Sequence, residues 1–375
     1  MSKLVLVTGG AGFIGTHLVR KLLATGLQVR IFDNLSPQIH GQDAKFDPPS
    51  GAEFIYGDVT NRNDLERALV DVDTIVHLAA ETGTGQSMYE IDRYYRINVQ
   101  GTALIFDILA NQQHRSVTNF VLASSRSVYG EGAYTCSACK TRQFPPPRQK
   151  EQLARHDWDP QCPACGAKLA AAPTREDDKL QPASVYAATK LAQEELVRVS
   201  APTLGMGYSI FRFQNVYGEG QSLANPYTGI LSIFSTRIRL GLSLPIFEDG
   251  HETRDFVHVE DVADAVLASI VKPALSGVTA NVGAGRATSI MEMATLLAQL
   301  MDAKQYPYVS KAYRVGDIRH NFADLTQLQE AFSVEPRIAI DEGLRRFAAW
   351  VGTQPIPEDQ LDKANEELRK RNLAG

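Results

Sequence analysis

The sequence has few cysteines, little net charge and no long apolar run, and each of these shortages excludes a class of protein. Its 375 residues include 38 basic and 43 acidic side chains, for a net charge of −5, so no broad basic surface for nucleic acid is expected. The apolar run at residues 4–7 is too short for a signal peptide, and no run approaches the length of a membrane span. We therefore expect a cytoplasmic protein that binds neither nucleic acid nor membrane.

The four cysteines form two CxxC pairs, Cys136 with Cys139 and Cys162 with Cys165. Two tight turns that each present two thiolates suit a tetrahedral metal site, and a reducing compartment favours metal over disulfide. The spacing therefore predicts a structural zinc ion. A redox dithiol is a weaker alternative because neither pair opens a helix after a strand. A catalytic zinc is weaker still because four thiolates leave no open coordination position.

Short β-rich runs alternate with helical segments along most of the chain, and a length of 375 residues suits two lobes. Strands are predicted at 4–7, 29–33, 54–58, 74–78, 119–123 and 208–213, and helices at 13–25, 61–69, 184–200, 291–301, 338–350 and 358–371, the last as a solvated surface helix. The alternation predicts an α/β fold, with a Rossmann-type doubly wound parallel sheet covered on both faces.

One stretch, residues 134–173, breaks the alternation and holds all four cysteines, so it is interpreted as an inserted zinc-ribbon-like knuckle. We expect the Rossmann domain to comprise residues 1–133 and to resume at 174–214. A smaller α/β substrate lobe is expected over residues 215–375, of which about 255–282 returns to the Rossmann domain.

A glycine-rich loop follows the first predicted strand, where residues 10–15 read GAGFIG. Glycines at this spacing allow a tight turn, the approach of a pyrophosphate and the packing of helix on strand. Asp33 ends the next predicted strand, where a carboxylate can bond both hydroxyls of an adenosine ribose and repel a 2′-phosphate. The pattern predicts binding of NAD rather than NADP, and a glycine turn without a ligand is the weaker alternative.

The sequence YAATK opens a predicted helix and places Tyr186 and Lys190 one turn apart on the same face. A lysine ammonium near a phenol favours the phenolate, so we expect the pKa of Tyr186 to be lowered toward working pH. On its own, the pair is better explained as a surface tyrosine and lysine on an amphipathic helix.

Further motifs remove this ambiguity. They read TGGAGFIG at 8–15, HLAA at 77–80, SSRSVYG at 124–130, RFQNVYG at 212–218, RDFVHV at 254–259 and RVGDIRH at 314–320. Together with YAATK, this ordered set resembles the extended short-chain dehydrogenase/reductase family, in its branch of nucleotide-sugar epimerases and dehydratases. The resemblance spans most of the chain and leaves only the cysteine insertion outside it.

The resemblance implies a role for each matching residue. It implies that Tyr186 is the acid and base, that Lys190 activates it, and that Ser125 bonds the reacting sugar hydroxyl. The implied cofactor contacts are Gly9, Gly12, Phe13, Ile14, Gly15, Asp33, Asn34, Asp58, Val59, Leu78, Ala79, Ala80, Asn98, Ser124, Tyr186 and Lys190. The implied substrate contacts are Arg126, Asn215, Arg254 and Arg319, of which the last two arginines suit a diphosphate or, alternatively, ordinary surface ion pairs.

The implied reaction starts with oxidation of the sugar at its 4-position. Dehydratases of the family carry an Asp-Glu pair directly after the catalytic residue, where this chain has Arg126 and Ser127. We therefore expect a nucleotide-sugar 4-epimerase that works through a transient 4-keto intermediate. Residues 124–132 and the insertion are similar to a subgroup of dTDP-rhamnose-type 4-epimerases, which makes a dTDP-6-deoxyhexose a candidate substrate. A 4,6-dehydratase, a 4-ketoreductase and a non-catalytic NAD-binding regulator are the alternatives.

Two expectations concern assembly and the insertion. The resemblance implies a homodimer that pairs helices at about 98–111 and 184–200. The insertion lies in the sequence between the serine segment and the Tyr186 helix, so we expect the knuckle at the mouth of the sugar site, where it would control which nucleotide sugar enters.

Overall fold

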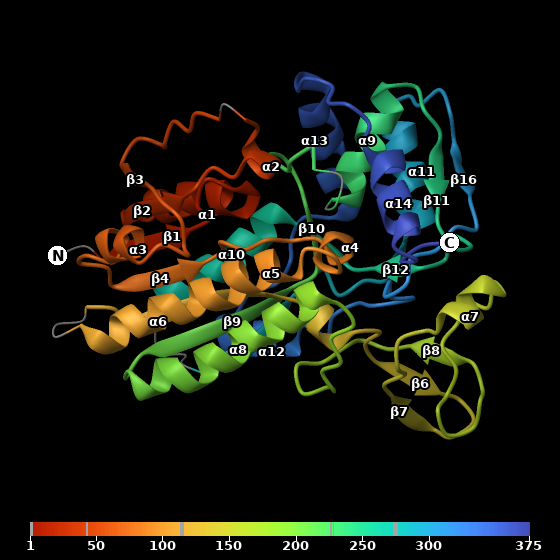
Figure 1. Ribbon diagram of the computed structural model, residues 1–375, viewed down its shortest axis with the longest axis horizontal. Helices are drawn as coiled ribbons and strands as arrows, with labels where there is room; N and C mark the ends of the chain where they lie inside the picture. The colour runs from red at the N-terminus through yellow and green to blue at the C-terminus, as the bar shows by residue number, and fades with distance from the viewer. Residues whose placement is uncertain (1–2, 43, 113–115, 226, 228, 273–276) are drawn as a thin grey trace.

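A seven-stranded sheet forms the centre of the molecule, seen in a computed structural model that describes residues 3–42, 44–112, 116–225, 227, 229–272 and 277–375 (Figure 1). All of its strands run parallel. Their order is β14 (Val278–Val282), β9 (Gly207–Phe213), β5 (Asn119–Ser125), β4 (Thr74–His77), β1 (Leu4–Thr8), β2 (Gln28–Asp33) and β3 (Ala52–Tyr56). The order reverses direction between β1 and β4, which confirms the predicted doubly wound sheet.

Helices cover both faces of this sheet because its strands are apolar on both sides. Val5 and Val7 of β1 belong to one buried cluster and Leu6 to the other, as expected for side chains that alternate along a strand. The helices of the first face are α1 (Phe13–Ala24), α10 (Val259–Val271) and α12 (Thr326–Phe332). Those of the second face are α3 (Arg62–Ala68), α6 (Gly101–Asn111) and α8 (Val185–Thr203).

A smaller lobe lies beyond the carboxyl ends of the strands and has its own buried cluster (Figure 1). Its helices are α9 (Ile230–Arg239), α11 (Ile290–Leu300), α13 (Ile340–Thr353) and α14 (Leu361–Lys370). Its short strand pairs are β10 (Asn215–Tyr217) with β13 (Phe256–His258), β11 (Leu244–Ile246) with β16 (Pro307–Val309), and β12 (Thr253–Arg254) with β15 (Thr288–Ser289). Helix α14 is not simply a solvated surface helix, since Leu361, Ala364 and Leu368 are buried.

The chain crosses between the two parts more than once. Helix α10 and strand β14, which come from the stretch 255–282, pack into the Rossmann part. Helix α12 does the same through Leu328 and Phe332, so a second segment of the C-terminal half also supports the sheet.

The insertion forms a small body at one corner of the molecule, drawn in yellow in Figure 1. Its antiparallel sheet has the order β7 (Thr141–Gln143), β6 (Tyr134–Cys136) and β8 (Leu169–Ala171), and α7 (Lys150–Ala154) lies beside it. Tyr134, Cys136, Cys162 and Leu169 form its buried centre. Across the part of the chain that the structure describes, no helix is long and apolar enough to cross a membrane.

Candidate active site

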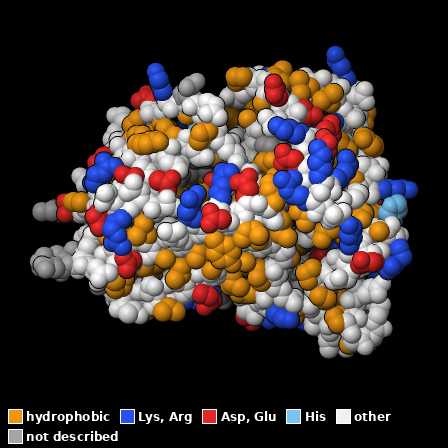
Figure 2. Space-filling model, in the orientation of Figure 1, with side chains coloured by type: hydrophobic (Ala, Val, Ile, Leu, Met, Phe, Trp, Pro, Cys, Tyr) orange, Lys and Arg blue, Asp and Glu red, His pale blue; other side chains and the backbone are white. Residues whose placement is uncertain are grey.

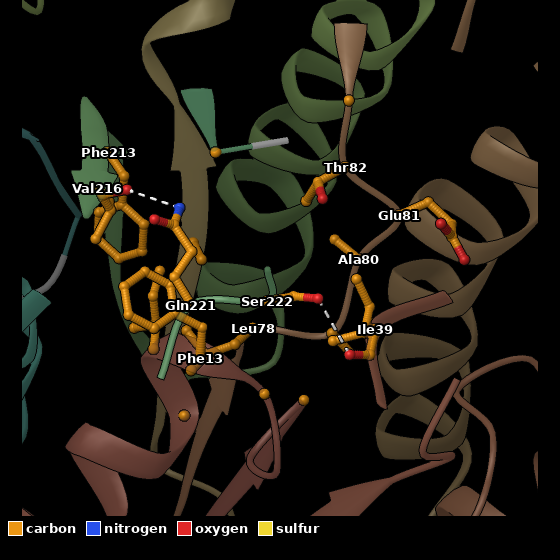
Figure 3. A pocket seen from close by; sticks show the side chains of 18 of the residues that line it. Phe13, Ile39, Leu78, Ala80, Glu81, Thr82, Phe213, Val216, Gln221 and Ser222 are labelled. Atoms are coloured by element: carbon orange, nitrogen blue, oxygen red, sulfur yellow. Dashed lines mark hydrogen bonds between the residues drawn. The ribbon is translucent and has the colours of Figure 1, made fainter. Parts of the chain in front are cut away.

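A cavity of about 720 Å³ opens where the sheet meets the smaller lobe. Its walls come from the segments after β1, β2, β4, β5 and β9 and from the start of α9. Figure 3 labels lining residues from the segments after β1, β2 and β4, and from the end of β9 and the segment that follows it. The cavity thus lies at the carboxyl ends of the strands, at the switch point between β1 and β4, where ligands of doubly wound folds bind. None of residues 134–173, all of which are described, lines it.

The glycine loop forms the floor of this cavity and leaves no room for side chains at two positions. Gly9 has φ of +69°, and a Cβ there would lie 2.7 Å from the backbone nitrogen of Ala79. A Cβ on Gly15 would lie 2.4 Å from the carbonyl oxygen of Gly9. Helix α1 then begins after Gly12, whose residue type offers no capping side chain, so its first N–H groups face the cavity wall as a phosphate site.

Asp33 lines the cavity at the end of β2, and its carboxylate is held by two backbone donors. One oxygen accepts from the N–H of Ala11 at 3.1 Å and the other from that of Leu35 at 2.9 Å. These bonds fix a negative charge beside the glycine loop, where a ribose hydroxyl can donate to it and a phosphate is repelled.

Asn34, Asp58 and Val59 continue the wall on the β3 side. The amide of Asn34 donates to Asp58 at 2.8 Å. Burial raises the pKa of Asp58, but hydrogen bonds from Thr60 and Asn34 outweigh this effect, so the pKa is lowered and the group is a carboxylate at neutral pH. Asn34 and Val59 line the cavity, whereas Asp58 lies behind them.

Asn98 supports the opposite wall from outside the cavity. It lies in a π-helical segment at Tyr95–Gln100, a geometry that is frequent at functional sites. Its amide oxygen accepts from the N–H of Glu81 at 2.8 Å, and its amide nitrogen donates to the carbonyl of Glu81 at 3.1 Å and to Thr189 at 3.0 Å. Asn98 thereby ties the loop that follows Leu78, Ala79 and Ala80 to helix α8.

Ser125, Tyr186 and Lys190 meet at the cavity, together with Ser124. Helix α8 brings Tyr186 and Lys190 to the end of β5, and Ser184 caps this helix by accepting from the N–H of Ala187 at 3.1 Å. The Lys190 ammonium donates to the carbonyl of Ala123 at 2.9 Å. Behind them, the hydroxyl of Ser124 donates to the buried carboxylate of Glu194.

The pKa of Tyr186 differs from the expectation that Lys190 lowers it. Burial raises the pKa of Tyr186, and the smaller lowering effects come from Ser125 and from the charge of Arg126. Burial also lowers the pKa of Lys190 to about 7, so Lys190 carries only part of a positive charge at neutral pH. The expectation that Lys190 lowers the pKa of Tyr186 was therefore wrong, because it ignored the desolvation of both groups.

Two of the four predicted substrate residues line the cavity. Arg126 follows Ser125 directly, and Asn215 begins β10, where its buried amide oxygen has no hydrogen-bond partner among the residues that the structure describes. Burial lowers the pKa of Arg126 to about 9, helped by the nearby charge of Arg254. The guanidinium of Arg126 suits an anionic group of a ligand, and the amide oxygen of Asn215 suits a hydrogen-bond donor of the same ligand.

The other two predicted substrate residues do not line the cavity. Arg319 is 3% exposed, and its guanidinium donates to Asp249 at 2.7 and 2.8 Å and to Glu248 at 3.1 Å. Arg254 donates to backbone carbonyls and has its nearest carboxylate, Asp317, at 3.9 Å. Arg319 is thus committed to several short ion pairs, while Arg254 has one longer ion pair, with Asp317.

Several lining residues were not identified from sequence because no local motif marks them. The segment at Glu81–Thr84, residue His40 and the lobe residues Gln221, Ser222 and Tyr227 all border the cavity. Figure 3 shows Ser222 reaching across to helix α2 (Pro37–His40), where the carbonyl oxygen of Ile39 accepts a hydrogen bond from the Ser222 hydroxyl at 3.3 Å. The lobe therefore contacts the Rossmann part directly over the cavity.

The four cysteines converge in the insertion. All four sulfur atoms lie within 4.8 Å of one another, with Cys136 and Cys165 3.6 Å apart and Cys139 and Cys162 3.9 Å apart. Both separations are far longer than the roughly 2 Å of a disulfide. They match the edges of about 3.8 Å of a tetrahedron whose metal–sulfur distance is about 2.3 Å.

The position of the insertion contradicts the expectation that it lies at the mouth of the sugar site. It packs instead on the outside of the smaller lobe, where the rings of Trp158 and Tyr313 meet at a tilt with their centroids 6.4 Å apart, and Leu153 belongs to the same buried cluster. The sequence shows only that the insertion begins and ends close together in the chain, and this does not determine toward which part of the molecule it extends.

Comparison with known proteins decides the family. The sequence profile of the NAD dependent epimerase/dehydratase family matches residues 5–151 and 163–283, which is well over half of the chain. The chain belongs to the NAD dependent epimerase/dehydratase family. This confirms the resemblance drawn from the motifs, and the unmatched residues 152–162 fall inside the insertion.

Relatives of this family member extend over nearly its whole length. The dTDP-L-rhamnose 4-epimerase of Burkholderia thailandensis is 39% identical over 369 residues, which cover 97% of each chain. The UDP-glucose 4-epimerase of Thermotoga maritima, solved with UDP-glucose, is 27% identical with a TM-score of 0.74 and covers 92% of this chain and 98% of its own. The UDP-glucose 4-epimerase of Thermus thermophilus, solved with NAD, is 25% identical with a TM-score of 0.72 and covers 94% and 100%.

Proposed function

We propose that the protein is an NAD-dependent 4-epimerase of a nucleotide-diphosphate sugar. The observation that carries this proposal is the meeting of Ser125, Tyr186 and Lys190 at the cavity that also contains the glycine loop and Asp33. A proton-transfer group and a dinucleotide site that share one cavity can oxidise and reduce a sugar carbon in place.

NAD fits the residues present. Its pyrophosphate fits against the glycine loop, where Gly9 and Gly15 keep space free and the first N–H groups of α1 can donate to it. Its adenosine ribose suits the carboxylate of Asp33. When bound, NAD⁺ accepts a hydride from the sugar carbon and returns it. Lys190 and Ser124 border the part of the cavity next to Tyr186 and suit the nicotinamide end.

The chain's own residues move the proton. Tyr186 takes the proton of the sugar 4-hydroxyl and later returns it, while the Ser125 hydroxyl bonds the same sugar oxygen and holds it in place. In its charged form Lys190, whose Nζ lies 6.0 Å from the centroid of the Tyr186 ring, would favour the phenolate that accepts this proton. Inversion then requires only that the keto sugar turn over before reduction.

Epimerisation is favoured over dehydration by the residues that follow Ser125. Arg126 lines the cavity, and the hydroxyl of Ser127 is buried without a partner among the described residues. Neither side chain can remove a proton from carbon and donate one to a leaving hydroxyl, as a dehydratase requires.

The substrate class follows from the charges and from the relatives. Arg126 lines the cavity, and the charge of Arg254 acts on it; two such cations suit a diphosphate, although Arg254 also has Asp317 at 3.9 Å. Asn215 adds a buried acceptor for a donor of the sugar or base. We assign a dTDP-6-deoxyhexose as substrate because the relative with 39% identity is a dTDP-L-rhamnose 4-epimerase.

A structural zinc ion in the insertion is part of the proposal. Cys136, Cys139, Cys162 and Cys165 present four sulfur atoms at the spacing of a tetrahedral site. Zinc there stabilises the insertion and takes no part in the reaction, since four thiolates complete its coordination.

A homodimer and a cytoplasmic location complete the proposal. Figure 2 shows apolar side chains gathered over the face of α5 (Ile91–Tyr94), α6 and α8, and Ile91 and Val199 of these helices are 52% and 67% exposed. A second copy pairing α6 and α8 would cover this face. Light scattering that gives the mass of one chain would contradict the dimer.

The cytoplasmic location is supported by the four cysteines, because a reducing compartment keeps the four thiols available for metal.

The function is tested with protein purified without added cofactor. Incubated with a panel of nucleotide sugars, it is expected to interconvert 4-epimers of a dTDP-sugar with no net change in NADH absorbance. A net change would indicate a reductase, and an accumulating 4-keto-6-deoxy sugar would indicate a dehydratase.

A further inference from the structure

Four charged residues form a closed, buried ring between the insertion and the smaller lobe. Arg148 of the insertion donates to Glu131 at 3.0 Å and to Glu248 at 2.9 Å. Arg319 donates to the same oxygen of Glu248 at 3.1 Å, and its backbone N–H donates to Glu131 at 2.8 Å. Each of these side chains is at most 4% exposed. Because buried charges need partners, each member holds the next in place.

The ring fixes the segment at residues 317–319 from the insertion side, and Arg254 holds it from the other side. Arg148 donates to the carbonyl of Asp317 at 3.0 Å. Arg254 donates to the carbonyl of Ile318 at 2.8 Å and to that of Arg319 at 3.2 Å. Three successive carbonyls are therefore bound by two guanidiniums, so a shift of this segment moves Arg254.

Glu248 shows how tightly the ring determines its surroundings. Its backbone has φ of 50°, in the left-handed region that side chains other than glycine seldom adopt. Its N–H donates to the carbonyl of Ala312 at 2.8 Å, and its carboxylate receives two arginines. Removing one arginine therefore releases a strained residue as well as an ion pair.

Arg254 is the link from this ring to the cavity. Its chain neighbour Asp255 accepts, at its backbone carbonyl, the N–H of Asn215 at 2.9 Å, and Asn215 lines the cavity. The charge of Arg254 also acts on Arg126, which lines the same cavity and whose pKa it helps to lower. We propose that Arg148 is a positioning residue, through which the insertion sets the place of Arg254 and Arg126 and so the affinity for the diphosphate of the nucleotide sugar. This inference rests on the proposed function. The insertion acts at a distance, without lining the substrate cavity.

The test compares Arg148→Gln with Arg142→Gln in the NAD-loaded protein. Arg142 anchors the same insertion to Asp178 and to the carbonyl of Pro173, and none of its hydrogen bonds reaches a member of the ring. Titration calorimetry measures the Kd for dTDP, and a steady-state assay with the nucleotide sugar gives KM and kcat. Absorbance measures the content of bound NAD, and scanning calorimetry measures the unfolding temperature.

We expect Arg148→Gln to raise the Kd for dTDP and the KM by about tenfold, with kcat within about twofold and NAD content unchanged. Arg148→Lys restores the charge without the planar fork and recovers part of the affinity. Arg142→Gln is expected to lower the unfolding temperature but to leave the Kd for dTDP unchanged. Equal Kd values for Arg148→Gln and the parent, or an equal loss in Arg142→Gln, would overturn the proposal.

Two further measurements keep the test decisive. If Arg148→Gln does not fold, the charge-balanced Arg148→Gln/Glu131→Gln variant replaces it with the same expected rise in Kd. Chelation of metal from the parent protein is expected to raise its Kd for dTDP toward the Kd of Arg148→Gln. In Arg148→Gln itself, chelation should raise the Kd by less than about twofold. If the two effects on the Kd multiply, the metal and Arg148 do not act through the same contacts, which contradicts the proposal. A parent protein that neither binds dTDP nor turns over any nucleotide sugar overturns the proposed function itself, a result distinct from equal Kd values.

Discussion

Lys190 Nζ lies 6.0 Å from the centroid of the Tyr186 ring and donates to the backbone of β5 instead of to the phenol. The two side chains share one face of α8, yet burial controls the pKa of both. The two groups are thus brought to one helix face, while burial opposes the charged form of each.

The first prediction concerns the stability of the cofactor-free protein. The pKa of Lys190 is about 7 in the folded chain and 10.5 as its ordinary value, so the unfolded chain binds more protons between these values. The free energy of unfolding is therefore expected to rise with pH from 7 toward 10.5. The destabilisation caused by burying Lys190 is fully present below pH 7. Denaturant unfolding at pH 7.0, 8.0 and 9.0 measures this slope.

The matched control is Lys190→Met, in which the rise of the free energy of unfolding with pH should be smaller than in the parent. His77 does not interfere, since burial lowers its pKa to about 3 from 6.5 and its titration falls below pH 6.5. A slope of the same size in Lys190→Met would contradict the assignment.

The second prediction concerns the acid and base. Tyr186→Phe removes the phenol and is expected to lower kcat by about 10²- to 10⁴-fold while bound NAD stays unchanged. Tyr95→Phe, a change at a residue that is 42% exposed on a neighbouring helix, serves as the control and should keep full activity. Normal turnover by Tyr186→Phe in a steady-state assay would refute the role of Tyr186.

The third prediction concerns cofactor choice. Asp33→Asn removes the charge that the ribose hydroxyls would bond, so we expect NAD binding to weaken by about ten- to a hundredfold. Its discrimination against NADP should shrink as well, because the repulsion of a 2′-phosphate is lost. Asp47→Asn, which changes an exposed acid on the following connection, should leave both affinities as they are. The measurement is fluorescence titration, and unaltered discrimination in Asp33→Asn counts against the proposed ribose contact.

The fourth prediction concerns the insertion. Elemental analysis should find about one zinc ion per chain, and Cys136→Ser should lose it with a fall in unfolding temperature but with NAD still bound. Ser137→Ala in the same turn should retain the metal. Full zinc content in Cys136→Ser, or metal-free parent protein purified without chelator, is incompatible with the site.

Local patterns were enough to predict the sheet and the cofactor side of the cavity. The glycine loop, Asp33 and the pair of Tyr186 and Lys190 each depend on neighbours within one turn or one strand–loop–helix unit, so their spacing carries the information. Strand and helix positions were predicted for the same reason, since burial on both faces leaves apolar runs.

Features set by distant contacts could not be predicted in this way. Arg319 and Arg254 occur in similar motifs, but only the structure shows that carboxylates surround Arg319 while Arg254 has its nearest one at 3.9 Å. The direction of the insertion depends on the packing of Trp158 against Tyr313, residues far apart in the sequence. The raised pKa of Tyr186 depends on burial by several segments at once.

The most direct test of the central claim is proton NMR of a dTDP-6-deoxyhexose incubated in D₂O with the protein and no added cofactor. If the same hydride leaves and returns, the two 4-epimers reach equilibrium and the hydrogen on carbon 4 is retained. Incorporation of deuterium at carbon 4, or no interconversion of any nucleotide sugar in the panel, would contradict the account.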